Sequence, residues 1–211
     1  MKVLLINGSP HQNGCTYTAL AEVASTLNEE GIETVIFQIG AQPIRGCMAC
    51  GKCYELGKCV FDDKVNEFTA LAAEYDGFVF GSSVYYAGMN GSLKCLMDRA
   101  FYSSSGQDPN PFRFKPVAAV ASARRAGTTA TLDQMHKYFY LLQMPIVTSR
   151  YWNMVHGNTP EQVKQDEEGL QVMRILGRNM AWMLKLIENG EKNGIGHPEQ
   201  KETGIYTNFI R

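Results

Sequence analysis

Five short apolar segments, separated by segments of helical periodicity, constrain the fold of this chain more than any other feature. They are residues 3–6, 34–37, 77–81, 116–121 and 145–148. The first is a continuous apolar run that stops at a dense turn signal, as expected for a strand buried on both faces. Parallel strands need crossover connections, which are nearly always helices, so the pattern predicts an α/β fold with a parallel sheet covered on both faces.

The helical segments alternate with the apolar ones and continue after the last of them. They predict helices over residues 14–30, 65–74, 92–102, 129–142 and 160–187. In the last helix, Thr159 is the expected N-cap and Pro160 the first helical residue. Its apolar stripe is interpreted as core packing and consists of Leu170, Met173, Leu176, Met180, Met183 and Leu184. At 211 residues we expect one domain, residues 1–211, with a cysteine loop at 46–60 and a tail without clear periodicity at 189–211.

Charge and the N-terminal sequence narrow the function. The formal net charge is −1 and no basic run is longer than Arg124-Arg125, so nucleic acid is not an expected partner. The N-terminal apolar run is too short for a membrane span and lacks a signal-peptide cleavage site, so we expect no membrane association and a cytoplasmic location. Thiols stay reduced in that compartment, where a dense cysteine loop is more often metal-binding or redox-active than disulfide-bonded.

Four cysteines lie within thirteen residues, at Cys47, Cys50, Cys53 and Cys59. Soft sulfur ligands select iron-sulfur clusters or zinc, and the glycines at 46, 51 and 57 let the loop curl so that several thiolates converge. Three interpretations stay open at this point: a four-iron, four-sulfur cluster held by all four thiolates, a zinc site or vacant reduced thiols, and a disulfide.

The segments richest in Gly, Ser, Thr and Asn follow three of the predicted strands, at residues 8–16, 81–91 and 122–129. In a parallel sheet they should meet beyond the carboxyl ends of the strands, where ligands bind. The first leads into a helix N-terminus, and its amides and the hydroxyls of Ser9 and Thr16 favour a phosphate. It lacks both Gly-Lys-Ser/Thr and G-x-G-x-x-G, so a compact phosphomonoester such as that of FMN fits better than a Mg-nucleotide or a dinucleotide. The alternative is a merely capped turn.

These loops resemble those of the flavodoxin-like NAD(P)H-dependent FMN reductases. The motifs that carry the resemblance are Gly8-Ser9-Pro10, Asn13-Gly14-Cys15-Thr16, Gly81-Ser82-Ser83-Val84-Tyr85-Tyr86, Gly88-Met89-Asn90-Gly91-Ser92-Leu93-Lys94 and Asp98-Arg99. The resemblance covers roughly residues 1–150, and the four cysteines are similar to the compact cluster motif of the iron-sulfur flavoprotein branch. It implies a three-layer sandwich with a five-stranded parallel sheet of order 2-1-3-4-5 and helices on both faces.

By the same resemblance, three sets of residues would contact FMN. The phosphate would be held by the first loop, at Ser9, Pro10, Gly14, Cys15 and Thr16. The ribityl chain and the isoalloxazine ring would lie along Ser83, Val84, Tyr85, Tyr86 and Gly88. The pyrimidine end would be bordered by Ser122, Arg125 and Gly127.

Elementary chemistry favours the same assignment. The two adjacent tyrosines can offer broad faces to a tricyclic ring, and Arg124 or Arg125 can stabilise negative charge on a reduced flavin. The alternative is that both tyrosines belong to the core and both arginines to a solvated loop. A helix N-terminus would lower the pKa of the Cys15 thiol, although a small packed residue at this position needs no reactivity. His11 beside the phosphate turn is either close to a ligand or solvated.

Together with these patterns, the resemblance implies an FMN-dependent oxidoreductase that takes electrons from NAD(P)H, a transient reductant, and reduces flavins, quinones or similar small-molecule acceptors. No carboxylate pair or Ser/His/Asp order suggests hydrolysis, so no side chain is assigned as catalytic. One alternative is an iron-sulfur flavoprotein electron carrier fed by ferredoxin, and another is a zinc-stapled, non-catalytic binding module. The resemblance implies a homodimer or homotetramer, with the long helix and the tail residues Tyr206 and Phe209 as candidate contacts.

Overall fold

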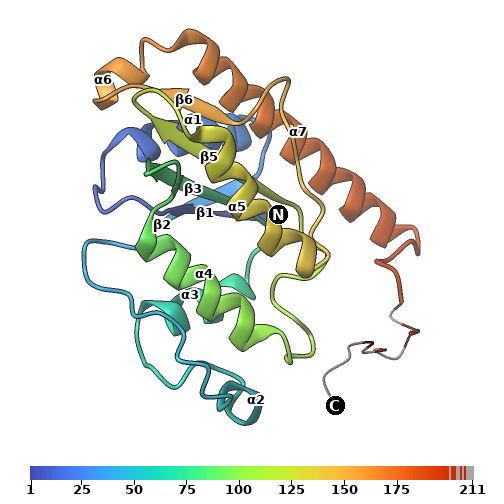
Figure 1. Cartoon of the computed structure of the whole chain (residues 1–211). Coiled ribbons are helices and arrows are strands. Elements are labelled where there is room, and N and C mark those ends of the chain that lie inside the picture. The colour runs from blue at the N-terminus through green and yellow to red at the C-terminus, as the bar shows by residue number, and fades with distance from the viewer. Residues whose placement is uncertain (200, 203–204, 206, 208–211) are drawn as a thin grey trace.

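A parallel sheet lies between two layers of helices (Figure 1) in the computed structural model, which describes residues 1–199, 201–202, 205 and 207. The strands are β1 (Lys2–Asn7), β2 (Glu33–Gln38), β3 (Gly77–Tyr85), β4 (Gly88–Met89), β5 (Val117–Ala123) and β6 (Met154–His156). The main sheet has the order β2-β1-β3-β5-β6 with parallel neighbours, and β4 pairs antiparallel with β3. The parallel strands thus follow the expected order 2-1-3-4-5, which confirms the flavodoxin-like fold class with six strands instead of five.

Helices cover both faces of the sheet (Figure 1). They are α1 (Cys15–Glu29), α2 (Cys53–Leu56), α3 (Lys64–Ala72), α4 (Gly91–Ser104), α5 (Thr128–Leu141), α6 (Pro160–Val163) and α7 (Glu167–Lys192). One face packs against α3, α4 and α5, and the other against α1, α6 and α7. Every helix in the described part of the chain is too short or too polar to cross a bilayer.

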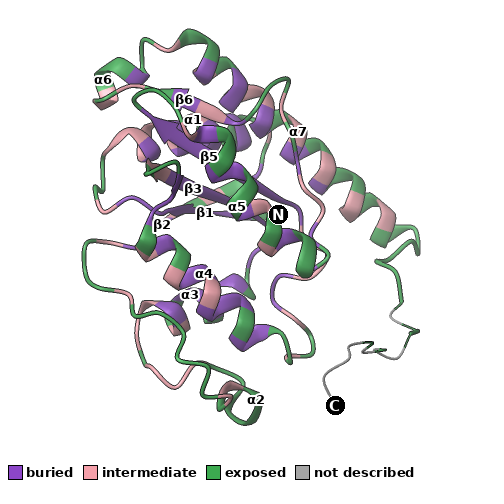
Figure 2. Cartoon of the chain, viewed as in Figure 1, coloured by how far each residue is buried: buried purple, intermediate pink, exposed green. Residues whose placement is uncertain are grey.

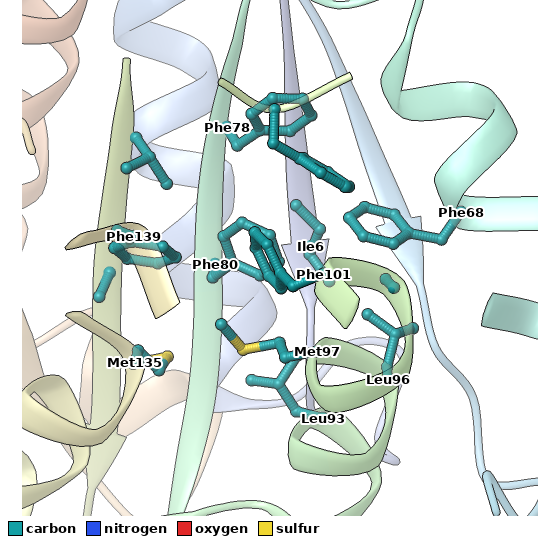
Figure 3. Packing of buried hydrophobic residues seen from close by; sticks show 14 of the residues in the cluster. Ile6, Phe68, Phe78, Phe80, Leu93, Leu96, Met97, Phe101, Met135 and Phe139 are labelled. Atoms are coloured by element: carbon teal, nitrogen blue, oxygen red, sulfur yellow. The ribbon is translucent and has the colours of Figure 1, made fainter. Parts of the chain in front are cut away.

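Each face of the sheet has its own apolar cluster, as the continuous apolar run of β1 requires. Successive side chains alternate between the two clusters: Leu5 faces α1 and α7, and Ile6 faces α3, α4 and α5. On the face covered by α3, α4 and α5, aromatic rings pack together: the Phe80 ring centroid lies 5.4 Å from that of Phe139 and 5.8 Å from that of Phe101 (Figure 3). Figure 2 shows the contrast between these buried strands and the exposed segment around α2.

The prediction of a fifth parallel strand at residues 145–148 is wrong. Ile146 makes only an isolated bridge to Val117, after which the chain leaves the sheet. The Ser149 hydroxyl then donates to the Val172 carbonyl oxygen at 2.8 Å, so this segment binds α7 instead of continuing along β5. Pairing with β5 resumes in β6, which is the true edge strand.

The long helix predicted over residues 160–187 is divided into α6 and α7. Asp166 causes the break, because one carboxylate oxygen accepts from the Gly169 amide at 2.9 Å and the other from the His156 amide at 2.6 Å. The side chain therefore caps a new helix and ties it to the edge strand. The apolar stripe of α7 is confirmed as core packing, and the helix extends to Lys192, into the segment expected to be a tail.

The short strand β4 was not predicted, because its turn lacks the usual turn residues. Tyr85 pairs with Gly88, so Tyr86 and Ala87 form a two-residue hairpin loop with φ of 49° and 57°. Asn and Gly normally occupy such turns, and a bulky residue there is strained by about 1–3 kcal/mol. Strain of this kind is typical of ligand-binding loops.

The close approach of the first loop to β3 depends on a glycine. The Gly8 amide donates to the Gly81 carbonyl oxygen at 2.8 Å, and a Cβ at position 8 would lie 2.6 Å from that oxygen. The first loop can therefore reach β3 only if residue 8 has no side chain.

We expect Gly8→Ala to lower the free energy of unfolding by about 1–3 kcal/mol, because the methyl group overlaps the backbone of β3. Urea unfolding followed by circular dichroism measures this. Gly91→Ala is the matched control, since a Cβ there meets nothing within 4 Å and alanine favours the helix. Equal unfolding midpoints for the two variants would contradict the assigned close approach.

Candidate functional site

A cleft of about 580 Å³ lies at the carboxyl ends of β1, β3 and β5. Its lining consists of Ser9, His11, Gln12, Asn13, Gly14, Cys15, Thr16, Ser83, Tyr85, Ser122, Asn158, Thr159 and Pro160. The volume is within the range of small-molecule sites. The described lining contains no lysine or arginine, so an anion here would be held by amides, hydroxyls and the ring of His11, which also lines the cleft.

The first loop of the cleft is held in shape by its own hydrogen bonds. The Asn7 amide group donates to the carbonyl oxygens of His11 and Gln12 at 3.3 and 3.2 Å, and its oxygen accepts from the Ser9 amide. Gln38 at the end of β2 donates to the Ser9 carbonyl oxygen at 2.7 Å. The loop is therefore preorganised by residues outside the cleft, which lowers the entropy lost on binding.

The start of α1 carries the features of an anion site. Its N-cap, Gly14, provides no capping side chain, and its first turn contains no acidic residue. The helix dipole and the free amides of this turn are thus available to a ligand. Thr16 is buried and its hydroxyl lies 2.7 Å from that of Ser122, which joins α1 to the end of β5.

Ser83 supplies the clearest sign that the cleft accepts a polar ligand. Its hydroxyl oxygen is buried and has no hydrogen-bond partner among the described residues. A buried hydroxyl without a partner costs about 1–3 kcal/mol, and such groups call for an explanation. Its place in the cleft lining makes a bound group the simplest explanation.

The second and third loops pack against each other. Gly127 has φ of 94°, and a Cβ there would lie 2.7 Å from the Ala87 Cα, so only glycine fits. Gln134 of α5 accepts from the Met89 amide at 2.9 Å and fixes β4. These contacts present Tyr85 half-exposed and Tyr86 fully exposed, so the core interpretation of the two tyrosines is wrong.

The cleft brings together about half of the residues expected to contact FMN. Those that line it are Ser9, Gly14, Cys15, Thr16, Ser83, Tyr85 and Ser122. Those that are not part of its lining are Pro10, Val84, Tyr86, Gly88, Arg125 and Gly127. Both Arg124 and Arg125 are exposed. Their loop is solvated in this structure, which agrees with the alternative interpretation of the arginines.

Sequence reasoning missed Asn158, Thr159 and Pro160 as part of the cleft. They follow β6 at its carboxyl end, where a parallel sheet gathers ligand-binding loops. The polar segment 157–159 could have indicated this. Because the fifth strand was predicted at residues 145–148, this segment was not recognised as the loop that directly follows a strand.

The four loop cysteines line a second, small hollow of about 20 Å³ together with Met48, Gly51, Val60, Phe61, Arg99, Tyr102 and Ser103. Cys47 and Cys50 are exposed, while Cys53 and Cys59 are half-buried. Cys53 begins the one-turn helix α2, which was not predicted. Positive φ values at Ala49 and Gly51, 54° and 70°, let the chain curl so that the four thiols face one side.

The thiols are near one another without forming a finished metal site. Within the described part of the chain, no three ligating side chains have the spacing needed for a single metal ion. The hollow is about the size of one water molecule, so a larger group requires the exposed part of the loop to move outward. The donor set fits an iron-sulfur cluster or zinc, because all four sulfurs belong to free thiols.

Burial raises the pKa of the Cys15 thiol, which donates to the Gly157 carbonyl oxygen at 3.6 Å. The nearby Glu161 carboxylate acts in the same direction. The expected lowering of this pKa by the helix N-terminus is therefore wrong, because desolvation is the larger effect.

In reduced, metal-free protein at pH 8, we expect iodoacetamide to label Cys47 and Cys50 before Cys15. The two loop thiols are exposed, whereas Cys15 is partly buried and its raised pKa leaves less thiolate. Peptide mass spectrometry over a time course measures the order, and Cys15→Ser identifies the slow peptide. Labelling of Cys15 as fast as the loop thiols would contradict the burial assigned to it.

Comparisons with known proteins agree with this geometry. The family model of NADPH-dependent FMN reductases matches residues 1–159. An iron-sulfur flavoprotein of Methanocaldococcus jannaschii is 34% identical over 89% of this chain and 100% of the relative, and one of Archaeoglobus fulgidus is 28% identical over 87% and 97%. A solved archaeal flavodoxin has a TM-score of 0.58 at 16% identity, covering 88% of this chain and 99% of its own. The chain belongs to the NADPH-dependent FMN reductase family, within its iron-sulfur flavoprotein branch, and is by family an FMN-dependent oxidoreductase.

Proposed function

We propose that the cleft binds FMN and that NAD(P)H reduces this flavin, which then delivers electrons to a small-molecule acceptor such as a quinone or free flavin. The observation that carries the proposal is the unpartnered Ser83 hydroxyl in a cleft whose first loop is held in shape by hydrogen bonds from Asn7 and Gln38. Bound FMN would supply the hydride and electron chemistry. The protein would position the flavin and limit access to it.

The phosphate end of the cofactor is assigned to the first loop. The uncapped first turn of α1 offers amides and the positive end of the helix dipole, and Ser9 adds a hydroxyl. Thr16 and Ser122, which contact each other, would position the ribityl chain between α1 and β5. This arrangement suits a phosphate monoester, because the described lining offers no lysine or arginine for a longer phosphate chain.

The ring end is assigned to the hairpin between β3 and β4. Tyr85 lines the cleft and Tyr86 is fully exposed at a strained φ of 49°. An exposed aromatic residue held at such strain needs a compensating contact, and a flat ring system that stacks on it supplies one. Nicotinamide would need only brief stacking on the opposite face of the flavin.

We also propose that the cysteine loop holds a four-iron, four-sulfur cluster, which would let the protein act as an electron carrier. The family branch, the four thiols around one hollow and the buried cation Arg99 beside them support a negatively charged metal centre. To make room for a cluster, Cys47 and Cys50 would move outward, because they lie in the exposed part of the loop. Zinc and empty thiols are the alternatives that metal analysis separates.

A homodimer or homotetramer is proposed as the working assembly. On α7, Trp182 and Leu186 lie outside the apolar stripe that packs into the core, and both are exposed. Large apolar groups on one helix face are typical of a subunit contact. The candidate contact residues Tyr206 and Phe209 lie outside the described residues.

We expect Ser83→Ala to weaken FMN binding about 5- to 10-fold, the effect of one lost hydrogen bond. The same change should leave the stability of the apoprotein unaltered or slightly higher, because the hydroxyl has no partner among the described residues. Fluorescence titration and urea unfolding measure the two effects. Ser104→Ala is the control, since that hydroxyl bonds within α4 and lies outside the cleft lining. Unchanged FMN affinity in Ser83→Ala would remove Ser83 from the site.

Anaerobically purified protein should contain FMN. Addition of NADPH or NADH should bleach the flavin absorbance near 450 nm within one turnover. Iron and acid-labile sulfide near four per chain would support the carrier function in addition. Flavin that bleaches in protein without iron or sulfide would support the reductase alone. A colourless protein with one zinc per chain would overturn both proposals and favour the zinc-stapled module.

A further inference from the structure

Arg99 of α4 is a charged residue with only 1% exposure, and it lies against the cysteine hollow. A buried charge is costly unless it is paired and hydrogen-bonded. Its charge is paired with Asp63, to which it donates two bonds of 2.6 and 2.9 Å. The ion pair accounts for the burial, but it uses only part of the guanidinium.

The remaining donors of Arg99 bind the cysteine loop. Its Nε and Nη2 both donate to the Cys59 sulfur at 3.2 Å, and further bonds reach the carbonyl oxygens of Arg45 and Phe61. With Asp63 these make six contacts for the five N–H groups of the guanidinium, so all five are used and Nη2 shares its two among three acceptors. Arg99 thus holds the loop before its first cysteine and after its last.

Cys59 is fixed more firmly than Cys47 and Cys50, the exposed cysteines of the loop. Asn66 of α3 accepts from the Cys59 amide at 3.0 Å and donates to the Cys59 carbonyl oxygen at 2.9 Å. Backbone and sulfur are both held, whereas Cys47 and Cys50 are exposed. If the loop opened to admit a metal centre, Cys59 would be the ligand already held in place.

We propose that Arg99 is a positioning residue that presents the Cys59 sulfur as a doubly hydrogen-bonded ligand and thereby raises the reduction potential of the cluster. The inference rests on the proposed cluster. Hydrogen bonds to a ligand sulfur and a nearby positive charge both stabilise the more negative, reduced state. Asp63 opposes this effect by cancelling part of the positive charge of Arg99. The reduction potential would therefore lie between the value without Arg99 and the value with an unpaired Arg99.

The test compares the cluster midpoint potentials of holoprotein variants by dye-mediated anaerobic titration with electron paramagnetic resonance. Arg99→Lys keeps the charge but loses the two N–H donors in fixed geometry, so its potential should shift downward. Asp63→Asn keeps an N-cap for α3 and leaves Arg99 on Cys59 with less compensation, so its potential should shift upward. Arg174→Lys, which alters an ion pair with Glu22 on α1, is the matched control and should match wild type.

Opposite shifts of the midpoint potential in the two variants support the proposal. A purely structural role would reduce the cluster content of both variants without shifting their potentials in opposite directions. Unchanged potentials, or shifts in the same direction, overturn it while the cluster proposal stands. If Arg99→Lys fails to fold, the Asp63→Asn potential decides, and a value at or below wild type overturns the assignment. Wild-type protein without iron and sulfide overturns the cluster proposal and this inference together.

Discussion

The contact between Gly8 and Gly81 is the constraint on which the cleft depends. It brings the loop after β1 against the end of β3, and each glycine leaves room that a Cβ would fill: at position 81 a Cβ would lie 2.8 Å from the Leu20 side chain. α1 can therefore begin directly over β3, with the amides of its first turn free. Asn7 and Gln38 then hold the loop in shape without any ligand. Backbone proximity, more than charged side chains, thus shapes the loop that we propose to bind a phosphate.

Much of this arrangement could be predicted from the sequence, because strong local signals and topology agree. The apolar run of β1, its turn and the helix after it identified the first loop, and the strand order followed from the family resemblance. The errors came where long-range contacts override local pattern. Residues 145–148 look like a strand, yet Ser149 binds α7, and Asp166 breaks a helix because the His156 amide needs an acceptor. The Tyr86-Ala87 turn violates turn preferences and could not be predicted by them.

The hairpin beside the cleft and the cysteine loop are connected to different turns of α4. The helix starts at Gly91, directly after β4, and its ninth residue, Arg99, contacts the cysteine loop. At a rise of about 1.5 Å per residue, roughly 12 Å of helix separates these points. α4 is therefore the rigid element that fixes the cysteine loop relative to the hairpin of the cleft. Arg99 fastens an otherwise exposed loop to this helix, through the Arg45 carbonyl oxygen at one end and through the Phe61 carbonyl oxygen and Asp63 at the other.

The central claim is that the first loop binds the phosphate of a flavin mononucleotide. Titration of the apoprotein with FMN and with riboflavin, followed by flavin fluorescence, tests it directly, because the two ligands differ only in the phosphate. Charge-assisted hydrogen bonds contribute about 1.5–3 kcal/mol each, so two of them predict FMN binding about 100-fold or more tighter than riboflavin. Equal affinity for the two ligands would contradict the account, since the preorganised loop and the uncapped helix would then have no part in binding.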